Sequence, residues 1–336
     1  MSSGRSAEEP GADQRCEVEH EPDIDASAIA AVARTRAHGM HYFGQILGIR
    51  PRPADGGPTG PELAPDCSVT PGAVPPVALA ALADLAMGSA VRTAVGDGRR
   101  LGTVTMALHH IAAVVIAPVS SAAHLVWIDE DQRHALARVD CIDARGVLVA
   151  AGQGWFTSLP APTGVPLRPL PWEFDELPAV PPVAADELEH REQAAVEATR
   201  RAAGRARTRG TSVSEELTAL DWDATAPEGT ARGSLRIGPE MTNRVGHLQG
   251  GALYGIGLAA AARAVGSLDG SADRSAALVP ADGSWQFLAP GDGEALVAEA
   301  VVRRAGRRTA FASVTLTVDG RDVGAGQFAF RQHAAD

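Results

Sequence analysis

The chain has 336 residues, of which 45% are hydrophobic, and this is enough for two domains or for one large domain with an ample core. Its formal net charge of -11 at pH 7 argues against general nucleic-acid binding, because that binding needs a basic surface to displace counterions from phosphates. Its three cysteines, Cys16, Cys67 and Cys141, are widely spaced and form no CxxC or zinc pattern. We therefore expect no metal and a reducing, cytoplasmic compartment.

Residues 1–22 are polar and acidic and lack the apolar core of a secretory signal, so we expect a disordered tail. The sequence then predicts an amphipathic helix over residues 25–39, a Pro-, Gly- and Asp-rich loop over 50–65, and an apolar helix over 72–91 whose Pro-Pro pair suits a first turn. Four β-like runs follow at residues 103–116, 122–128, 135–142 and 147–156.

A proline-rich linker is predicted over residues 159–182, followed by a charged helix over about 184–207 with acids at its start and arginines at its end. The second half then repeats the first. Its order is a strand near 233–237, a long apolar helix, and strands at 276–287, 294–303, 309–318 and 323–330. The predicted regions are a tail at 1–22, an N-terminal unit at 23–158, a linker and helix at 159–210, and a C-terminal unit at 211–333.

The repeat can be checked residue by residue. Shifting the second half by 174 positions places Gly246 on Gly72 and Val265 on Val91 without a gap. Matches of Ala on Ala carry little weight in so Ala-rich a chain, whereas the shared order of elements carries more. We interpret the chain as an internal duplication.

The central helix of the second half lies in the stretch from Asn243 to Val265, and it carries no charge between Gln249 and Ala262. Such a helix must be buried on nearly every side. The Gly-Gly pair at its start would leave the first backbone N–H groups open to a ligand at the positive end of the helix dipole. The alternative is that the two glycines only permit a tight turn and close packing. Both apolar helices are rich in Ala and Gly, and we expect neither to span a membrane.

Three motifs of the second half carry a resemblance to a known family. They are N-x-x-G-x-x-Q-G-G-x-L from Asn243 to Leu253, W-Q-F-L-A-P from Trp285 to Pro290, and the arginine-rich hairpin of residues 300–310. They resemble the PaaI-like acyl-CoA thioesterases of the hotdog superfamily over nearly all of the second half, and the first half is a weaker match. The resemblance implies an α+β double hotdog, with two curved antiparallel sheets that each wrap a long central helix.

In that family two hotdogs pair, and each site combines the helix N-terminus of one with an acid midway along the helix of the other. The acid's position is Leu258 in the second half and, counting from Pro75, Asp84 in the first. Each half thus retains what the other has lost. The resemblance therefore implies one composite site, made by Asp84 and the turn at Gln249 and Gly250.

The resemblance also implies the roles at that site. The Gly250 N–H would stabilise the oxyanion, and Asp84 would act as general base or as nucleophile, which the sequence leaves open. A lone carboxylate in an apolar helix should have a raised pKa. Asn243 would hold the loop or the substrate carbonyl, Gln249 would orient substrate or water in place of the usual histidine, and Thr103 would help to position water.

Substrate binding is assigned to Gly251, beside the oxyanion donor, and to Arg307 and Arg308, which could meet the phosphates of coenzyme A or could simply be solvated hairpin arginines. The resulting prediction is a hydrolase of acyl-CoA or a related acyl thioester, with coenzyme A only as part of the substrate. We expect no nucleic-acid or membrane partner. The two halves should form an intramolecular pseudo-dimer, and two such chains could pair back to back.

Two other functions stay open. A non-catalytic acyl-CoA-binding or sensor protein would need the same pocket but not Asp84. A hotdog hydratase or dehydratase would need a paired Asp and His on the first turn of the helix, and that pair is absent from this sequence.

Overall fold

The computed structural model describes residues 23–52, 60–64, 73–96, 99–160, 170–173, 177–243, 245–268 and 278–333. The tail predicted at 1–22 lies outside the described residues, as do parts of the loop predicted at 50–65 and of the linker predicted at 159–182.

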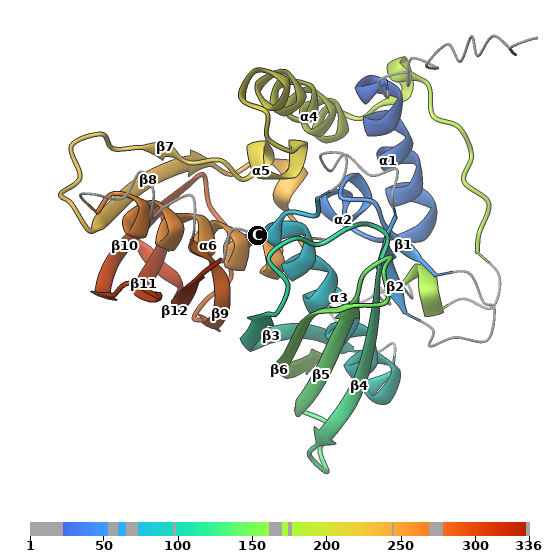
Figure 1. Ribbon diagram of the computed structural model, residues 1–336. Coiled ribbons are helices and arrows are strands. Elements are labelled where there is room, and N and C mark those ends of the chain that lie inside the picture. The colour runs from blue at the N-terminus through green and yellow to red at the C-terminus, as the bar shows by residue number, and fades with distance from the viewer. Residues whose placement is uncertain are drawn as a thin grey trace, which may run out of the picture.

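The first half wraps one long helix in an antiparallel sheet (Figure 1). That helix, α3 (Pro76–Val95), begins at the second proline of the predicted Pro-Pro pair, and Pro75 is its N-cap. A first-turn proline costs little because the N–H that it lacks has no acceptor within the helix. The strands are β1 (Ile49–Pro51), β2 (Pro61–Leu63), β3 (Arg99–His110), β4 (Val119–Ile128), β5 (His134–Ile142) and β6 (Leu148–Pro160).

The second half repeats this plan around α6 (Gly250–Gly266). Its strands are β7 (Asp221–Trp222), β8 (Thr230–Arg236), β9 (Leu278–Phe287), β10 (Ala295–Ala305), β11 (Thr309–Val318) and β12 (Arg321–Gln332). The first helical residues of the two central helices, Pro76 and Gly250, are 174 positions apart (250 minus 76), which is the shift found in the sequence.

The two halves join edge to edge through β3 and β9, which pair antiparallel with Ala107 opposite Ser284. The strand order is β1-β2-β4-β5-β6-β3 and then β9-β12-β11-β10-β8-β7, so the second half mirrors the first outward from this seam. The predicted α+β arrangement, in which antiparallel strands wrap a long central helix in each half, is confirmed, with one correction: the two curved sheets are one continuous 12-stranded sheet. The buried residues of both halves also form one contiguous hydrophobic core.

The two central helices cross at close range near the start of α6. A Cβ added at Gly251 would lie 2.3 Å from the Cα of Ala81 and 2.5 Å from its backbone nitrogen. Only a glycine lets the two backbones approach so closely. This contact brings the N-terminus of α6 onto the middle of α3, close to Asp84.

Four further helices form a separate apolar cluster across one end of the molecule (Figure 1). They are α1 (Ile24–His38), α2 (Tyr42–Ile46), α4 (His190–Arg209) and α5 (Val213–Leu217). Asp23 caps the start of α1, and Gly39 ends it with a positive φ of 66°, as the sequence predicts. The charged helix is confirmed as α4, whereas α2 and α5 are single turns that the sequence did not predict.

Helix α3 alone, among the helices that the structure describes, is long and apolar enough to cross a membrane. However, 72% of its apolar stretch is buried inside the protein, where α3 serves as a core helix of the first half.

Candidate active site

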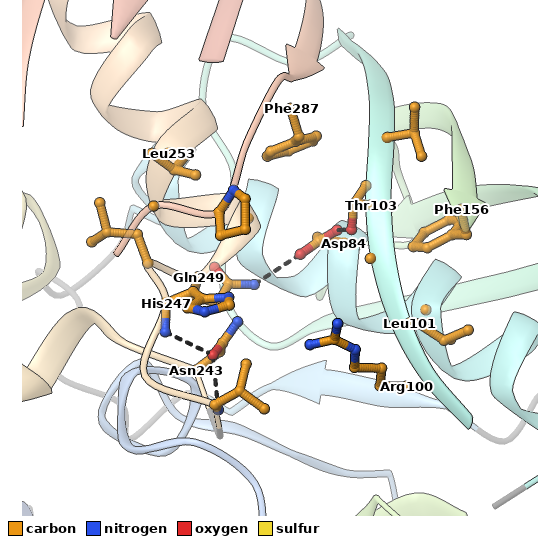
Figure 2. A pocket seen from close by; sticks show the side chains of 18 of the residues that line it. Asp84, Arg100, Leu101, Thr103, Phe156, Asn243, His247, Gln249, Leu253 and Phe287 are labelled. Carbon is orange, nitrogen blue, oxygen red and sulfur yellow. Dashed lines mark hydrogen bonds between the residues drawn. The ribbon is translucent and has the colours of Figure 1, made fainter. Parts of the chain in front are cut away.

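A cavity of about 440 Å³ opens where the two halves meet. One wall comes from α3, β3 and β6 of the first half (Figure 2). The other comes from Asn243 and residues 245–250, which lead into the start of α6, and from the end of β9 with the loop after it. A cavity of this size suits a small-molecule ligand.

Asp84 lies midway along α3 and is 8% exposed. Its carboxylate accepts hydrogen bonds from both halves of the molecule. The Thr103 hydroxyl on β3 donates to Oδ1 at 2.8 Å, and the Gln249 side-chain amide donates to Oδ2 at 3.0 Å (Figure 2). The backbone N–H of Gly251 donates a third hydrogen bond. These donors hold the carboxylate in a fixed position against the start of α6.

Burial raises the pKa of Asp84 to about 6, and the hydrogen bonds from Thr103 and the Gly251 N–H hold it below the value that burial alone would give. Asp84 is therefore mostly ionised at neutral pH and still basic enough to accept a proton. A carboxylate with this pKa is poised for general-base chemistry near pH 7.

Gln249 is the N-cap of α6, and both ends of its amide have partners. Its Oε1 accepts a hydrogen bond from the Ala252 N–H at 2.9 Å, so its Nε2 must face Asp84. Gln249 thereby links the start of the helix in one half to the carboxylate in the other. Its predicted role in orienting substrate or water stays a prediction.

Gly250 is the first residue of α6, so its N–H has no acceptor within the helix. No hydrogen bond from this N–H to another described residue is present. A Cβ added at Gly250 would lie 2.6 Å from Asp84 Oδ2, which shows how closely the carboxylate approaches. An open donor at the positive end of a helix thus lies beside a carboxylate, in one cavity.

Asn243 lines the cavity, and its hydrogen bonds form the turn that leads into α6. Its Oδ1 accepts from the N–H groups of Val245 at 3.0 Å and His247 at 3.1 Å. Its carbonyl oxygen accepts from Gly246, which has a φ of 86° that favours glycine. These bonds support the loop-holding alternative for Asn243.

Arg307 and Arg308 do not line this cavity. They lie in the turn between β10 and β11. Strand pairing through β12 and β11 aligns Phe287, at the cavity, with residues near the start of β10, which is the end of that strand away from the turn. The corresponding turn of the first half, between β4 and β5, lies at the cavity's end of the sheet, next to Thr157. That turn carries three acids, Asp129, Glu130 and Asp131, and a single arginine, Arg133. The arginine hairpin is therefore at the opposite end of the sheet.

The cavity also contains polar residues that the sequence reasoning missed. They are His41, Arg92, Arg100 and His247. Arg92 could have been found, because it follows Asp84 by eight residues and so lies on the same face of α3. Arg100 was missed because it lies before residue 103, where its strand was predicted to begin. No group of three His, Cys, Asp or Glu residues suited to a metal ion occurs in the described part of the chain.

The internal repeat places a second, pseudo-symmetric position opposite this site, at the start of α3 and the middle of α6. That position lacks the donor and the acid. Pro76 stands in α3 where Gly250 stands in α6, and a proline has no N–H to donate from that position. Leu258, at the position of Asp84, is an apolar side chain that is 3% exposed. The structure thus brings Asp84, Thr103, Gln249 and Gly250 together at one site and gives the pseudo-symmetric position neither donor nor acid.

Residues 239–331 match the family model described as the acyl-CoA thioesterase N-terminal domain. A search of the curated proteins finds no matching sequence.

Similar solved structures include the tesB protein of Mycobacterium avium subs paratuberculosis, which is 13% identical with a TM-score of 0.49; the likeness covers 87% of this chain and 100% of that one. Acyl-CoA thioesterase II TesB2 from Mycobacterium marinum is 14% identical with a TM-score of 0.42, and 74% of this chain and 88% of that one are covered. A Bacillus halodurans protein with CoA is 18% identical with a TM-score of 0.39, and 44% of this chain and 97% of that one are covered.

Proposed function

We propose that this protein hydrolyses acyl-CoA, or a related acyl thioester, at one composite site. The observation that carries the proposal is the meeting of the ionisable Asp84 carboxylate of one half with the open Gly250 N–H of the other, within one cavity. The match of the second half to an acyl-CoA thioesterase domain supports the same chemistry.

Thioester hydrolysis needs a donor for the carbonyl oxygen, where negative charge grows in the transition state, and a group that drives attack at the carbonyl carbon. The Gly250 N–H would supply the donor, backed by the dipole of α6. Asp84 would remove a proton from the attacking water, or would itself attack the carbon. Thr103 would keep the carboxylate in place for either step.

We further propose that the chain is a PaaI-like thioesterase whose two halves arose by duplication and each lost one part of the ancestral site. At the pseudo-symmetric position, Pro76 replaces the glycine that would carry the donor N–H, and Leu258 replaces the acid. Activity would then need both halves of one chain, and one site per chain would be formed. A pairing of two such chains stays a prediction.

The test is a thiol-release assay with the full-length protein over acyl-CoA thioesters of several chain lengths, with binding of each measured in parallel by calorimetry. Hydrolysis predicts release of free coenzyme A with saturation by at least one substrate. Binding without release would support the sensor function instead. Addition of water to an enoyl-CoA without thiol release would support the hydratase function.

The pH dependence of hydrolysis should follow the ionisation of Asp84. Because the base must be deprotonated, kcat/KM should fall tenfold per pH unit below about 6 and reach a plateau above it. Thr103→Val removes a hydrogen bond that favours the ionised form, so the midpoint should move to higher pH and kcat/KM at pH 6 should fall about tenfold.

The matched control is Thr105→Val, on the same strand but outside the cavity, which should leave the profile unchanged. An identical midpoint in Thr103→Val and wild type would contradict the assignment of the pH dependence to Asp84.

A further inference from the structure

Two neighbouring arginines at the start of β3 have very different surroundings. Arg99 does not line the cavity, and it donates to Ser158, through Nε to the hydroxyl and through Nη2 to the carbonyl oxygen at 3.0 Å. Arg100 lines the cavity (Figure 2). Its side chain makes no hydrogen bond or ion pair with any residue that the structure describes, and its Nε is buried.

An unpaired guanidinium nitrogen buried in a cavity costs stability, because it has lost water without gaining a partner. The described residues that line the cavity do not supply the missing anion. Asp84 is the only carboxylate among the described residues that line it, and Asp84 is occupied by Thr103, Gln249 and the Gly251 N–H. With Arg92 also in the lining, the formal charge of the lining is positive. The free guanidinium therefore fits an anionic group of the ligand.

The anionic group should lie within the reach of an acyl chain. Arg100 precedes Thr103 by three residues, which is roughly 10 Å along an extended strand. In an extended pantetheine arm the first phosphate is roughly 15 Å from the sulfur, by standard bond lengths. Coenzyme A phosphates would also lie near the solvent, whereas the Arg100 Nε is buried. A carboxylate at the far end of the acyl group fits this position better.

We propose that the cavity selects acyl thioesters whose acyl chain ends in a second carboxylate, and that Arg100 binds this carboxylate through a bidentate ion pair. The guanidinium is planar and matches the geometry of a carboxylate, and charge-assisted hydrogen bonds in a cavity of low dielectric are strong. The substrate class is thus the monothioesters of dicarboxylic acids. This assignment rests on the hydrolysis proposed above.

The test compares adipoyl and suberoyl thioesters with hexanoyl and octanoyl thioesters of equal chain length. Each acyl group is supplied on coenzyme A and on N-acetylcysteamine, which carries no phosphate. Wild type should prefer the dicarboxylic substrates on both carriers. Arg100→Gln should lower kcat/KM for them by about 10- to 100-fold on both carriers, and should change the monocarboxylic substrates by no more than about twofold.

Arg308→Gln is the matched control, because it removes a positive charge far from the cavity and should leave the preference intact. If Arg100→Gln does not fold, Arg100→Lys replaces it: a lysine keeps the charge but loses the bidentate geometry, so the preference should fall about tenfold.

Equal losses for both acyl classes on coenzyme A, with none on N-acetylcysteamine, would show that Arg100 binds a phosphate and would overturn the proposal. So would an unchanged preference. A separate arm measures binding of the 5-carboxypentyl thioether of N-acetylcysteamine, which cannot be hydrolysed. Arg100-dependent binding of this compound without release of thiol from any thioester would refute the hydrolysis and support the carboxylate site.

Discussion

Replacing Asp84 with asparagine should lower kcat/KM for thioester hydrolysis by about 10³-fold, since a positioned general base typically contributes between about 10² and 10⁴. The geometry should survive, because asparagine is of the same size, its oxygen can accept from the Gln249 amide, and its NH2 group can donate to the Thr103 hydroxyl oxygen. What is lost is the ability to accept a proton or to attack carbon. Thiol release at saturating and limiting substrate, together with substrate binding, would measure this.

The same substitution should raise stability at neutral pH. Burial raises the pKa of Asp84 from 3.8 to about 6, so the folded protein holds the proton more tightly than the unfolded chain. The stability from this group is complete below pH 3.8 and is lost as pH rises through 6. Above that pH the buried ion costs about 3 kcal/mol, at 1.36 kcal/mol per pKa unit, and Asp84→Asn should recover much of it.

Chemical denaturation of wild type and variant at pH 4.5 and pH 7.5 would test the sign, since the gain should appear at pH 7.5 and shrink at pH 4.5. Asp322→Asn, at an exposed position on β12, is the control and should change neither activity nor stability. Hydrolysis within tenfold of wild type in Asp84→Asn would show that another group acts as the base.

The fold could be predicted because its signals are local and repeated. The apolar helices and the strands after them recur in the same order, and β11 occupies the residues that its alternation predicts. The strand predicted at 103–116 is observed as β3 at Arg99–His110. Residues 111–116 have β-like composition but lie beyond the last paired residue of that strand. Composition does not show where a partner strand ends.

The short edge strands were missed for a related reason. Strands β1, β2 and β7 have two or three residues each, which is too few for an alternating pattern to appear. Their place is set by the sheet that they extend. The location of the arginine hairpin was also beyond the sequence, because the register across four strands decides which end of the sheet meets the cavity.

The Gly250-Gly251 pair shows both what the sequence could predict about the site and what it could not. The sequence left open whether the glycines expose N–H groups to a ligand or permit close packing. In the structure the two functions fall on different residues. Gly250 carries the open N–H beside Asp84, whereas Gly251 lies against the backbone of Ala81 and donates to Asp84. The predicted contact of Gly251 with substrate stays a prediction. Its close packing against Ala81 requires a glycine at this position whether or not Gly251 contacts substrate.

Gly251→Ala should therefore destabilise the protein by at least about 3 kcal/mol. The added methyl group would meet the Ala81 Cα at 2.3 Å and the Ala80 carbonyl carbon at 2.8 Å. Both are backbone atoms, so no side-chain rotation can relieve the clash, and α6 must move away from α3. This movement would separate the Gly250 N–H from Asp84, so activity should fall even in the molecules that remain folded.

Gly204→Ala, at an exposed position of helix α4, provides the matched control, because a Cβ there meets no atom within 4 Å. Alanine is the better helix former by about 1 kcal/mol, so this variant should be slightly more stable than wild type. Urea denaturation would measure the free energy of unfolding of all three proteins. If Gly251→Ala and Gly204→Ala were equally stable, the helices would not cross as closely as described, and the site would not depend on that contact.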